Sequence, residues 1–404
     1  MALSSTSRVQ ISIVKEAAFG ETPVSGVVKN LRNTGETLNY TVSKTVSAEI
    51  NAYRATSSMI PTSAEAAGAI NYELSFGEYD ELIEATLQGT WEPIGTAGVS
   101  DSFSATLTAD TITASAAEPD FLLLDIGQWF NIVGTGTAND GKLFRVSKTV
   151  APTSTVITLD AGTPATVGGP FAATVLHAAR LSNGVIQPSF TLQRTVDDVG
   201  EYFSFRGMTV GSMSLNVASG SITTGDFNFM GRDSLQDNVT LMPSVAIESQ
   251  GNQVMSGVSG TTCALWVGGA PLVGTFINSI AMSYDNALRM QTALCTLGAV
   301  GVGVGTIAAT LDLEVYFASG ATFYEELLSN ANIEVAFTTF DAEGNGYIFT
   351  FPMCNVSSYT VNAGSQDADL LAQISVTPLL DLSNPVPALR KVVFIDRVGT
   401  AIAS

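Results

Sequence analysis

Two stretches far apart in the chain carry the same strand pattern, and this repetition constrains the fold more than any other feature of the sequence. Residues 212–218 and 358–364 both alternate larger apolar side chains with small polar ones, which is the pattern of a β-strand with one wet face. The match continues upstream through Tyr202-Phe-Ser-Phe and Tyr347-Ile-Phe-Thr, each preceded by an acidic turn that contains glycine. The simplest interpretation is a β-domain that occurs twice.

Each half also predicts a strand followed by a short amphipathic helix. In the first half, residues 68–74 have a strand pattern, acidic residues fill the first turn of the helix, and Gly89 can end it. In the second half, residues 310–317 have a strand pattern and Asn330 can end the helix. The apolar residues at helical spacing are Tyr79, Leu82, Ile83 and Leu87 in the first helix, and Phe323, Leu327 and Leu328 in the second. The order strand, helix, hairpin is therefore expected twice.

Length and charge limit the possible functions. At 404 residues the chain is too long for one ordinary domain. Hydrophobic residues make up 46% and charged residues only 13%, so we expect much of the surface to be covered by contacts between subunits. The 37 acidic against 17 basic residues give a net charge of -20, which argues against ordinary nucleic-acid binding, because such binding needs lysine and arginine.

Shifts in composition predict the domain organisation. Turn signals dominate the first residues, which we expect to form an arm that docks on a neighbour. A Thr/Ala/Ser-rich segment with several short strand patterns interrupts the first repeat and predicts a small inserted β-barrel. The predicted parts are an N-terminal arm (1–37), the first repeat (38–94 and 182–247), the inserted β-domain (95–181), a linker (248–262), the second repeat (263–385), and a C-terminal strand and tail (386–404).

No group of residues predicts catalysis or a cofactor. The only histidine, His177, lies in the segment least like an enzyme core, so we expect no Ser-His-Asp or Cys-His arrangement. The acidic pairs Asp80/Glu81 and Glu325/Glu326, which could serve a glycosidase, open two equivalent helices, where they offset the helix dipole. The three cysteines have unrelated spacings and are expected to be reduced.

Three further segments imitate known sites. Residues 341–348 resemble the start of a calcium loop, but Pro352 stands where the closing glutamate should be, so a hairpin turn is favoured. Residues 301–305 lack the helix that a dinucleotide fingerprint must open. Residues 293–310 are apolar but rich in glycine, which favours a mobile loop over a membrane span. The first eight residues show no secretory signal, so assembly in the cytoplasm is expected.

The order of many residues resembles the tail tube proteins, or major tail proteins, of long-tailed bacteriophages. Matches run along most of the chain, and the strongest block covers the first predicted helix and its flanks. Tyr53 departs from the family pattern, in which an acidic residue often precedes the arginine that corresponds to Arg54, and residues 95–181 lie outside the firm resemblance. The matching residues are Glu16, Phe19-Gly20, Thr22-Pro23, Leu31-Arg32, Ser47, Glu49-Ile50, Gly68, Glu73-Leu74, Tyr79-Asp80, Leu82, Leu87, Gly89, Trp91, Ser189-Phe190-Thr191, Gly207, Val210, Ser214-Leu215, Asp285-Asn286, Leu288, Tyr324, Asp341, Gly346-Tyr347 and Pro352.

The resemblance implies a mainly β fold: two repeated tail-tube-type β-sandwich or barrel domains, each with a short α-helix, plus an inserted small β-barrel domain. In such proteins the sheets of neighbouring units join into a closed barrel that leaves no exposed edge. Since each chain carries two copies, three chains would supply the six units of one ring. We therefore expect a homotrimer ring with pseudo-sixfold form, stacked into a tube on whose outside the inserted barrel sits.

The resemblance also implies a structural role in the virion tail during genome ejection. The expected partners are the chain itself, the tape-measure and tail-terminator proteins, and genome DNA that passes without specific binding; no membrane is expected. An acidic lumen suits this role, because it shares the sign of the DNA phosphates and does not hold them. The alternatives are another virion structural protein and an adhesive cell-surface β-protein, the latter opposed by the missing signal.

Two sets of residues are the candidate contact sites. The arm and the glycine-rich loop are expected to stack rings, because flexible backbone can order on a neighbour; these candidates are Glu16, Phe19, Pro23, Gly301 and Gly303. The wet faces of the repeated strands are expected to face the lumen; these candidates are Ser214, Asn216, Thr360 and Asn362. We predict no catalytic, cofactor-binding or metal-binding residue and no enzyme activity.

Overall fold

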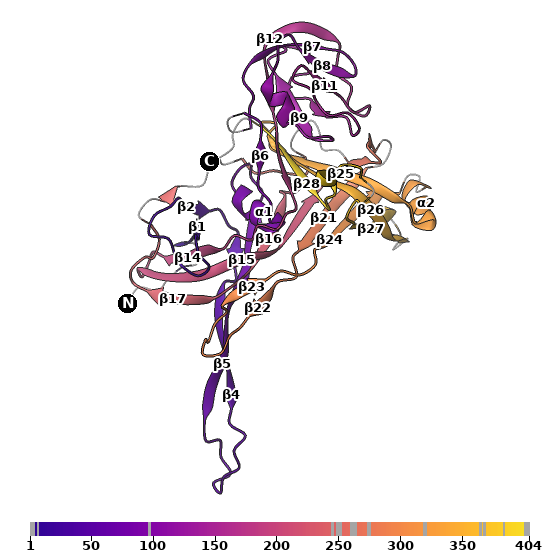
Figure 1. Cartoon of the computed structure of the whole chain (residues 1–404). Helices are drawn as coiled ribbons and strands as arrows, with labels where there is room; N and C mark the ends of the chain where they lie inside the picture. Colours follow the sequence, from indigo (N-terminus) through magenta and orange to yellow (C-terminus); the bar gives the residue numbers. More distant parts are fainter. Residues whose placement is uncertain are drawn as a thin grey trace.

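A computed structural model describes residues 5, 8–95, 98–243, 246–247, 253–258, 265–272, 276–317, 321–362, 366, 369–382 and 384–399. In these residues strands dominate and two α-helices occur (Figure 1). The predicted fold class, mainly β with a short α-helix in each half, is confirmed. No helix among the described residues has the length and apolarity needed to cross a membrane.

The same order of elements occurs in both halves of the chain. The first half contains β1 (Val9–Lys15), β2 (Val28–Leu31), β3 (Gly35–Glu36), β4 (Asn39–Val46), β5 (Met59–Glu73), α1 (Asp80–Leu87), β14 (Phe190–Val196), β15 (Glu201–Ala218), β16 (Thr224–Gly231), β17 (Asp233–Asp237) and the short β18 (Ala246–Ile247). The second half contains β19 (Leu265–Val267), β20 (Ala270–Pro271), β21 (Ile277–Asp285), β22 (Arg289–Gln291), β23 (Gly301–Gly303), β24 (Ala308–Tyr316), α2 (Ala321–Ser329), β25 (Asn332–Phe340), β26 (Gly346–Asn362), β27 (Leu371–Pro378), η3 (Pro387–Leu389) and β28 (Phe394–Val398).

The long strands β15 and β26 have the same irregularities in their ladders. Between Phe205 and Met208, β15 bulges opposite β14, and between Phe351 and Cys354, β26 bulges opposite β25. A second irregularity follows in both strands, opposite β16 and opposite β27. A β-bulge fixes the register of a strand, so residues at the same position relative to these bulges are counterparts in the two halves.

The bulges make Ser358 the counterpart of Ser212, as the sequence pattern predicts. They correct the upstream match by one residue. The counterpart of Tyr202 is Ile348 rather than Tyr347. The sequence comparison aligned the two tyrosines, whereas the equal spacing from each bulge makes Glu201 the counterpart of Tyr347. The two identical tyrosines suggested the wrong alignment because residues 346–350 are all buried, so no alternation of apolar and polar side chains marks the register there.

One continuous inner sheet joins the two halves. Its order is β4–β5–β16–β15 from the first half, followed by β21–β24–β27–β26 from the second. All these pairings are antiparallel. Apolar residues of this sheet alternate into the main core, and polar residues alternate onto the opposite face. The sheet therefore has one dry face and one wet face.

An outer layer covers the dry face. In the first half it consists of β2, β1, β14, the first part of β15, and β17. In the second half it consists of β20, β19, β25, the first part of β26, and β28. The strands β1 and β2 thus belong to a sheet of their own chain, where the sequence predicted an arm, because their short apolar runs complete the outer layer. Residues 16–27 remain as a loop between them.

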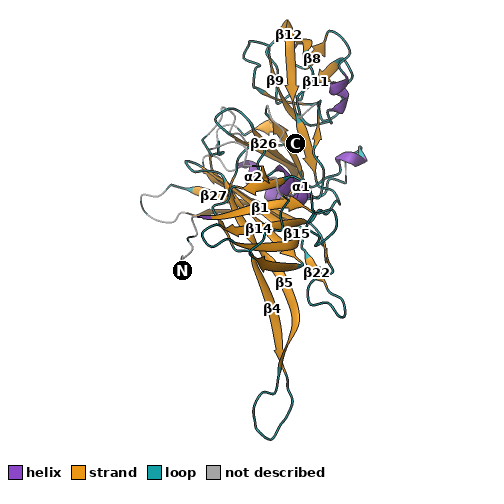
Figure 2. Cartoon of the chain, turned by 90° about the vertical axis from the view of Figure 1, so that its left-hand side faces the viewer, coloured by secondary structure: helices purple, strands orange, loops and turns teal. Residues whose placement is uncertain are grey.

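The inserted segment forms a separate small β-domain. It leaves and rejoins the body through β6 (Glu92–Pro93) and β13 (Ala179–Ser182), which extend the outer layer beside β28. Its sheet has the order β10–β9–β12–β7–β8–β11 around its own apolar core. Both views place it at the opposite end of the body from the β4–β5 hairpin (Figures 1 and 2). Its remaining elements are β7 (Phe103–Leu107), β8 (Thr111–Ala114), η2 (Pro119–Leu123), β9 (Trp129–Val133), β10 (Leu143–Arg145), β11 (Val156–Thr158) and β12 (Gly168–His177).

Candidate assembly edges and polar sheet face

The junction between the two halves is an antiparallel pairing of β15 with β21. Leu215 lies opposite Met282, and Met213 lies opposite Tyr284; all four side chains are buried. The N–H of Asn286 donates to the carbonyl of Gly211, and the N–H of Ser219 donates to the carbonyl of Asn278, at 2.9 Å each. Because backbone groups alternate in direction along a strand, the core-facing pairs exchange hydrogen bonds and the wet-face pairs do not.

Each strand of this junction has a counterpart at an edge of the inner sheet. The counterpart of β21 is the edge formed by β3 and β4, and the counterpart of β15 is β26. Within the described part of the chain, β4 pairs only with β5, and residues 358–362 of β26 pair only with β27. The two edges of the inner sheet are therefore formed by the counterparts of β21 and β15, the two strands that pair with each other in its middle.

Three apolar side chains at these edges are less covered than their counterparts in the junction, whereas Leu38 is as buried as its counterpart Met282. Tyr359 and Val361 are half-buried, whereas their counterparts Met213 and Leu215 are buried at 1% and 2% exposure. Tyr40 is half-buried, whereas its counterpart Tyr284 is 2% exposed. The edges thus carry apolar surface that the internal junction covers.

The β4 edge is capped by side chains of its own chain. The N–H of Thr37 donates to the carbonyl of Ala69 on β5, so the backbone groups of the next residue, Leu38, point to the open side. There the N–H of Leu38 donates to Glu36 at 2.7 Å, its carbonyl accepts from Arg194, and the N–H of Tyr40 donates to Asn39 at 2.9 Å. Arg194 and Glu36 also form an ion pair at 2.6 Å. Such charged capping protects an edge strand from unwanted pairing.

The wet face of the inner sheet carries acidic and small polar side chains. Asp226 on β16 accepts hydrogen bonds from Ser214 and from the Asn228 amide, the latter at 2.6 Å. Asp312 on β24 accepts from Ser375 of β27. No lysine or arginine occupies a wet-face position of the inner-sheet strands in residues 35–43, 65–73, 212–218, 224–230, 279–285, 308–316, 358–362 and 371–377. The carboxylates on this face are Glu65, Glu73, Asp226, Asp285, Asp312 and Glu314.

The structure places three predicted lumen-facing residues on this wet face. Ser214 is half-buried, and Asn216 and Thr360 are exposed. Ser214 lies opposite Ser283 across the internal junction, and Thr360 lies opposite Gln373 of β27. Asn362 is in β26, but its side chain lies outside what the structure describes. Whether this face lines a lumen stays a prediction.

Among the predicted ring-stacking residues, Glu16 forms its hydrogen bonds within its own chain. Its buried carboxylate accepts hydrogen bonds from Ser189 and Thr191 at the start of β14, at 2.7 and 2.8 Å. It also accepts from the N–H groups of Gly20 and Gly207, at 2.8 and 2.9 Å. These bonds hold the loop of residues 16–27 against the first repeat. Phe19 and Pro23 on the same loop are half-buried, and their stacking role stays a prediction.

The glycine-rich segment contains a strand. Gly301 and Gly303 lie in β23, opposite Gln291 and Arg289 of β22, where the sequence predicted a mobile loop. Ring stacking through these two glycines stays a prediction. The turn of this hairpin folds back on the first repeat, because the carbonyl of Leu297 accepts from the N–H of Ala64 at 2.9 Å.

The β4–β5 hairpin, which is the counterpart of the β22–β23 hairpin, projects from the body (Figure 2). The sequence did not lead us to predict this projection. Ile50 and Tyr53 near its tip are 98% and 90% exposed, and Met59 and Ile60 on its outer part are more than half exposed. Exposed apolar residues on a projecting hairpin indicate a contact surface. The period-two pattern from Asn39 onward could have revealed the first strand.

A buried polar cluster joins α1 to the outer layer of the second half. The Asp80 carboxylate accepts from the Tyr347 hydroxyl and pairs with Arg397 of β28. The N–H of Gly77 donates to the Tyr347 oxygen at 2.9 Å, and the Arg397 guanidinium lies 4.2 Å from the centre of the Phe76 ring. Burial, with Asp80 alongside, raises the pKa of Tyr347, so its hydroxyl stays protonated and donates.

The structure also places Asp341, weighed above for a calcium loop, His177, weighed for catalysis, and two of the three cysteines. Asp341 accepts hydrogen bonds from the N–H groups of Glu343 and Asn345, at 2.8 and 2.9 Å, and so closes the β25–β26 turn as expected. His177 is buried at the end of β12, where burial lowers its pKa. Cys295 is exposed and Cys354 is buried. The described residues hold no group of three or more metal-ligating side chains.

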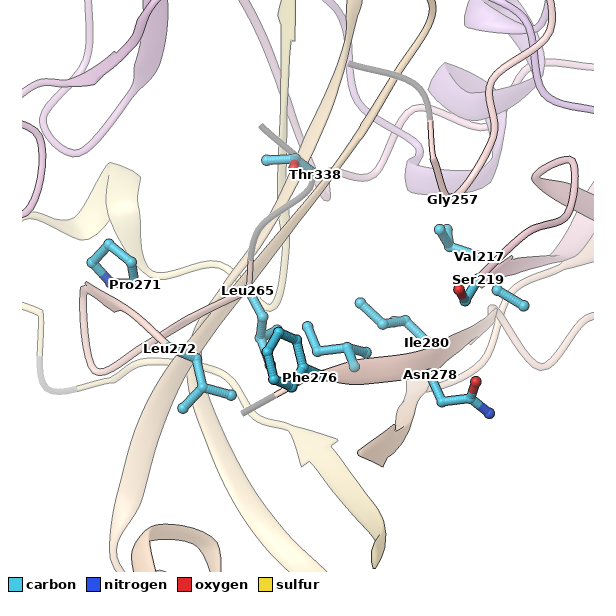
Figure 3. Close-up of a pocket in the computed structure, with 12 residues that line it drawn as sticks. Val217, Ser219, Gly257, Leu265, Pro271, Leu272, Phe276, Asn278, Ile280 and Thr338 are labelled. Carbon is cyan, nitrogen blue, oxygen red and sulfur yellow. The ribbon is translucent and has the colours of Figure 1, made fainter. Parts of the chain in front are cut away.

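An apolar cavity of about 300 Å³ lies beside the internal junction (Figure 3). Leu265, Leu272 and Phe276 gather on one side, and Val217 and Ile280 come from the two junction strands. The polar side chains in its lining are Ser219, Asn278 and Thr338. The described residues of this lining offer neither an acid–base pair nor a nucleophile next to a base.

Comparison with known proteins gives one family. The family model described as "Phage tail tube protein" matches residues 6–378. No curated protein matches the chain.

Proposed function

Because this chain belongs to the phage tail tube protein family, we propose that three copies close into one ring of the tail tube. The protein is a structural component of the virion tail. In the proposed ring, each chain supplies two of six similar units, so the ring has threefold symmetry and pseudo-sixfold form. Rings then stack into a tube.

The internal β15–β21 junction is the observation that carries this proposal. There the two halves of the chain pair within one continuous sheet, which supports a ring in which neighbouring chains pair in the same way. The chain then presents the counterpart of each junction strand at its two sheet edges. A closed ring gives each of these two edges a neighbouring strand to pair with, whereas an isolated chain leaves both edges unpaired.

We propose that the wet face of the inner sheet lines an acidic lumen. The carboxylates of this face repel DNA phosphates, and no wet-face lysine or arginine in the described strands can bind them. The opposite face is covered by the core and the outer layer. The genome then slides through the tube without specific binding, and Ser214, Asn216, Thr360 and Asn362 are the proposed lining residues.

The proposed role is mechanical, and the proposed partners are other tail proteins. The tape-measure protein would occupy the lumen during assembly, and the tail terminator would cover the last ring. We propose assembly in the host cytoplasm and no enzymatic activity. Phe19, Pro23 and the tip of the β4–β5 hairpin are the proposed ring-to-ring contacts. The tip, where Ile50 and Tyr53 are exposed, projects beyond the part of β4 that forms the edge of the inner sheet.

Electron microscopy of the purified chain over a range of concentrations tests this function. We expect hollow tubes built of stacked rings, or free rings at low concentration. Closed shells would favour another virion structural protein, and a monomer at all concentrations would contradict the proposal.

A further inference from the structure

We propose the register in which two copies meet: residues 358–362 of β26 in one copy pair antiparallel with residues 37–41 of the next, with Thr360 opposite Asn39 and Ser358 opposite Thr41. This inference rests on the proposed function and specifies the contact surface that closes the ring. The partner is a second copy of this chain.

The register follows from the counterparts of the internal junction. The bulges make Ser212 and Ser214 the counterparts of Ser358 and Thr360. The inner-sheet ladders make Asn39 the counterpart of Ser283, because Ala67 and Thr310, their partners on β5 and β24, are counterparts themselves.

Within the chain, the corresponding residues are already paired. Ser214 lies opposite Ser283, and Ser212 lies opposite Asp285. Transferring these two pairs to the chain edges places Thr360 opposite Asn39 and Ser358 opposite Thr41. The spacing of each pair is fixed by the bulges rather than by any choice of alignment.

The backbone groups needed for this pairing point outward at the β4 edge. The N–H and carbonyl of Leu38 and the N–H of Tyr40 face the open side, where Glu36, Arg194 and Asn39 cap them. At the internal junction, the counterparts of Leu38 and Tyr40 are Met282 and Tyr284, which lie opposite Leu215 and Met213. In the ring, Val361 and Tyr359 of the neighbouring copy replace the side-chain caps.

The side chains at the two edges fit the same register. Tyr359 would lie opposite Tyr40 on the core side, as Met213 lies opposite Tyr284 within the chain. The Tyr359 hydroxyl is buried and makes no hydrogen bond to the residues that the structure describes. Pairing covers the half-buried rings of both tyrosines. Aromatic cross-strand pairs of this kind stabilise a sheet.

Engineered disulfides test the register. The wet-face pairs are the ones that do not exchange backbone hydrogen bonds, and their close Cα spacing suits a disulfide. Starting from a chain with Cys263→Ser and Cys295→Ser, we would make two matched pairs, Asn39→Cys with Thr360→Cys and Thr41→Cys with Ser358→Cys. Two exchanged pairs use the same residues: Asn39→Cys with Ser358→Cys, and Thr41→Cys with Thr360→Cys. Ser214→Cys with Ser283→Cys, inside one chain, calibrates oxidation in this geometry.

After mild oxidation of assembled protein, non-reducing gels should show covalent dimers and trimers, and nothing larger, for the matched pairs. The exchanged pairs should remain largely monomeric on the gel. Rings visible by microscopy with cross-linking in the exchanged pairs, or with none in either set while the internal control closes, would overturn the register but leave the function standing. If the parent chain forms no rings, the proposed function itself fails. Should one variant not fold, the other matched pair supplies the same test.

Discussion

Buried charged residues in this chain each fix two distant elements. Glu16 accepts four hydrogen bonds that tie the loop after β1 to β14 and β15. Asp396 on β28 accepts a bidentate pair from Arg180 of β13, at 2.7 and 2.8 Å. A buried charge is tolerated only when it is paired or well hydrogen-bonded. The sequence could not predict these roles, because each partner lies far away in the chain.

Breaking the Arg180–Asp396 pair should strongly destabilise the chain. Both side chains are almost completely buried, so Arg180→Ala leaves an unpaired buried carboxylate and should lower the free energy of unfolding by about 3–5 kcal/mol. The double variant Arg180→Met with Asp396→Leu should recover most of this loss. Arg8→Ala, at an ion pair whose arginine is 62% exposed, is the matched control and should have little effect. Denaturant unfolding measures all of them, and an Arg180→Ala variant as stable as the control would refute this role.

The single histidine should make stability depend on pH in a specific direction. Burial lowers the pKa of His177 in the folded chain below its ordinary value of 6.5, so below that pH the unfolded chain binds more protons. Stability from this group is therefore complete above about pH 6.5 and is lost as the pH falls from there towards the folded pKa. Thermal unfolding of the wild type and His177→Gln between pH 7.5 and pH 5 measures the difference, by the linkage relation. Parallel pH profiles for the two proteins would show that His177 does not contribute.

At the scale of elements, alternation predicted the repeat but could not predict which edges stay open. The matching of residues 212–218 with 358–364 and the two helices were visible in the sequence, because core-facing periodicity is local. The membership of β1 and β2 in the outer layer was not, since their short apolar runs gain meaning only beside β14. The capping of Leu38 by Glu36 and Arg194 also depends on long-range pairing.

Weakening the cap on the β4 edge should favour assembly. Glu36→Gln keeps the shape of the side chain but removes the charge that pairs with Arg194. Less free energy is then needed to free the Leu38 N–H and carbonyl from these side chains so that they can pair with a second copy. If the cap is worth about 1 kcal/mol, the concentration needed for ring formation should fall about fivefold. Light scattering against protein concentration measures it, with Asp110→Asn in the inserted domain as the control for the lost charge. An unchanged or higher threshold for Glu36→Gln would mean that the cap does not oppose pairing.

At the scale of the whole molecule, the proposed ring has two kinds of seam between neighbouring repeats, one within each chain and one between chains. The seam within a chain has additional contacts in the outer layer, where β13 pairs with β28 and Asp80 binds Tyr347 and Arg397. At the seam between chains, the counterpart of Tyr347 is Glu201, and the link from α2 to β25 is too short to hold an inserted domain. We therefore expect the contacts between chains to open before the contacts between the two halves of one chain.

A positive charge on the wet face should slow the ejection of DNA through the tube. Asp312→Lys places lysines on the proposed lumen, where they attract phosphates, whereas Asp110→Lys makes the same charge change on the inserted domain. Virions carrying Asp312→Lys should assemble but eject DNA more slowly, with the delay reduced at high salt. Fluorescence of a DNA dye after triggered ejection follows the rate. Equal rates for the two variants would place Asp312 outside the path of the DNA.

The number of chains in one ring tests the central claim most directly. Native mass spectrometry of rings released from tubes gives this number from the chain mass of 42.1 kDa. The account predicts a mass of three chains. A ring of six chains, in which each chain contributes a single unit to the barrel, would contradict it.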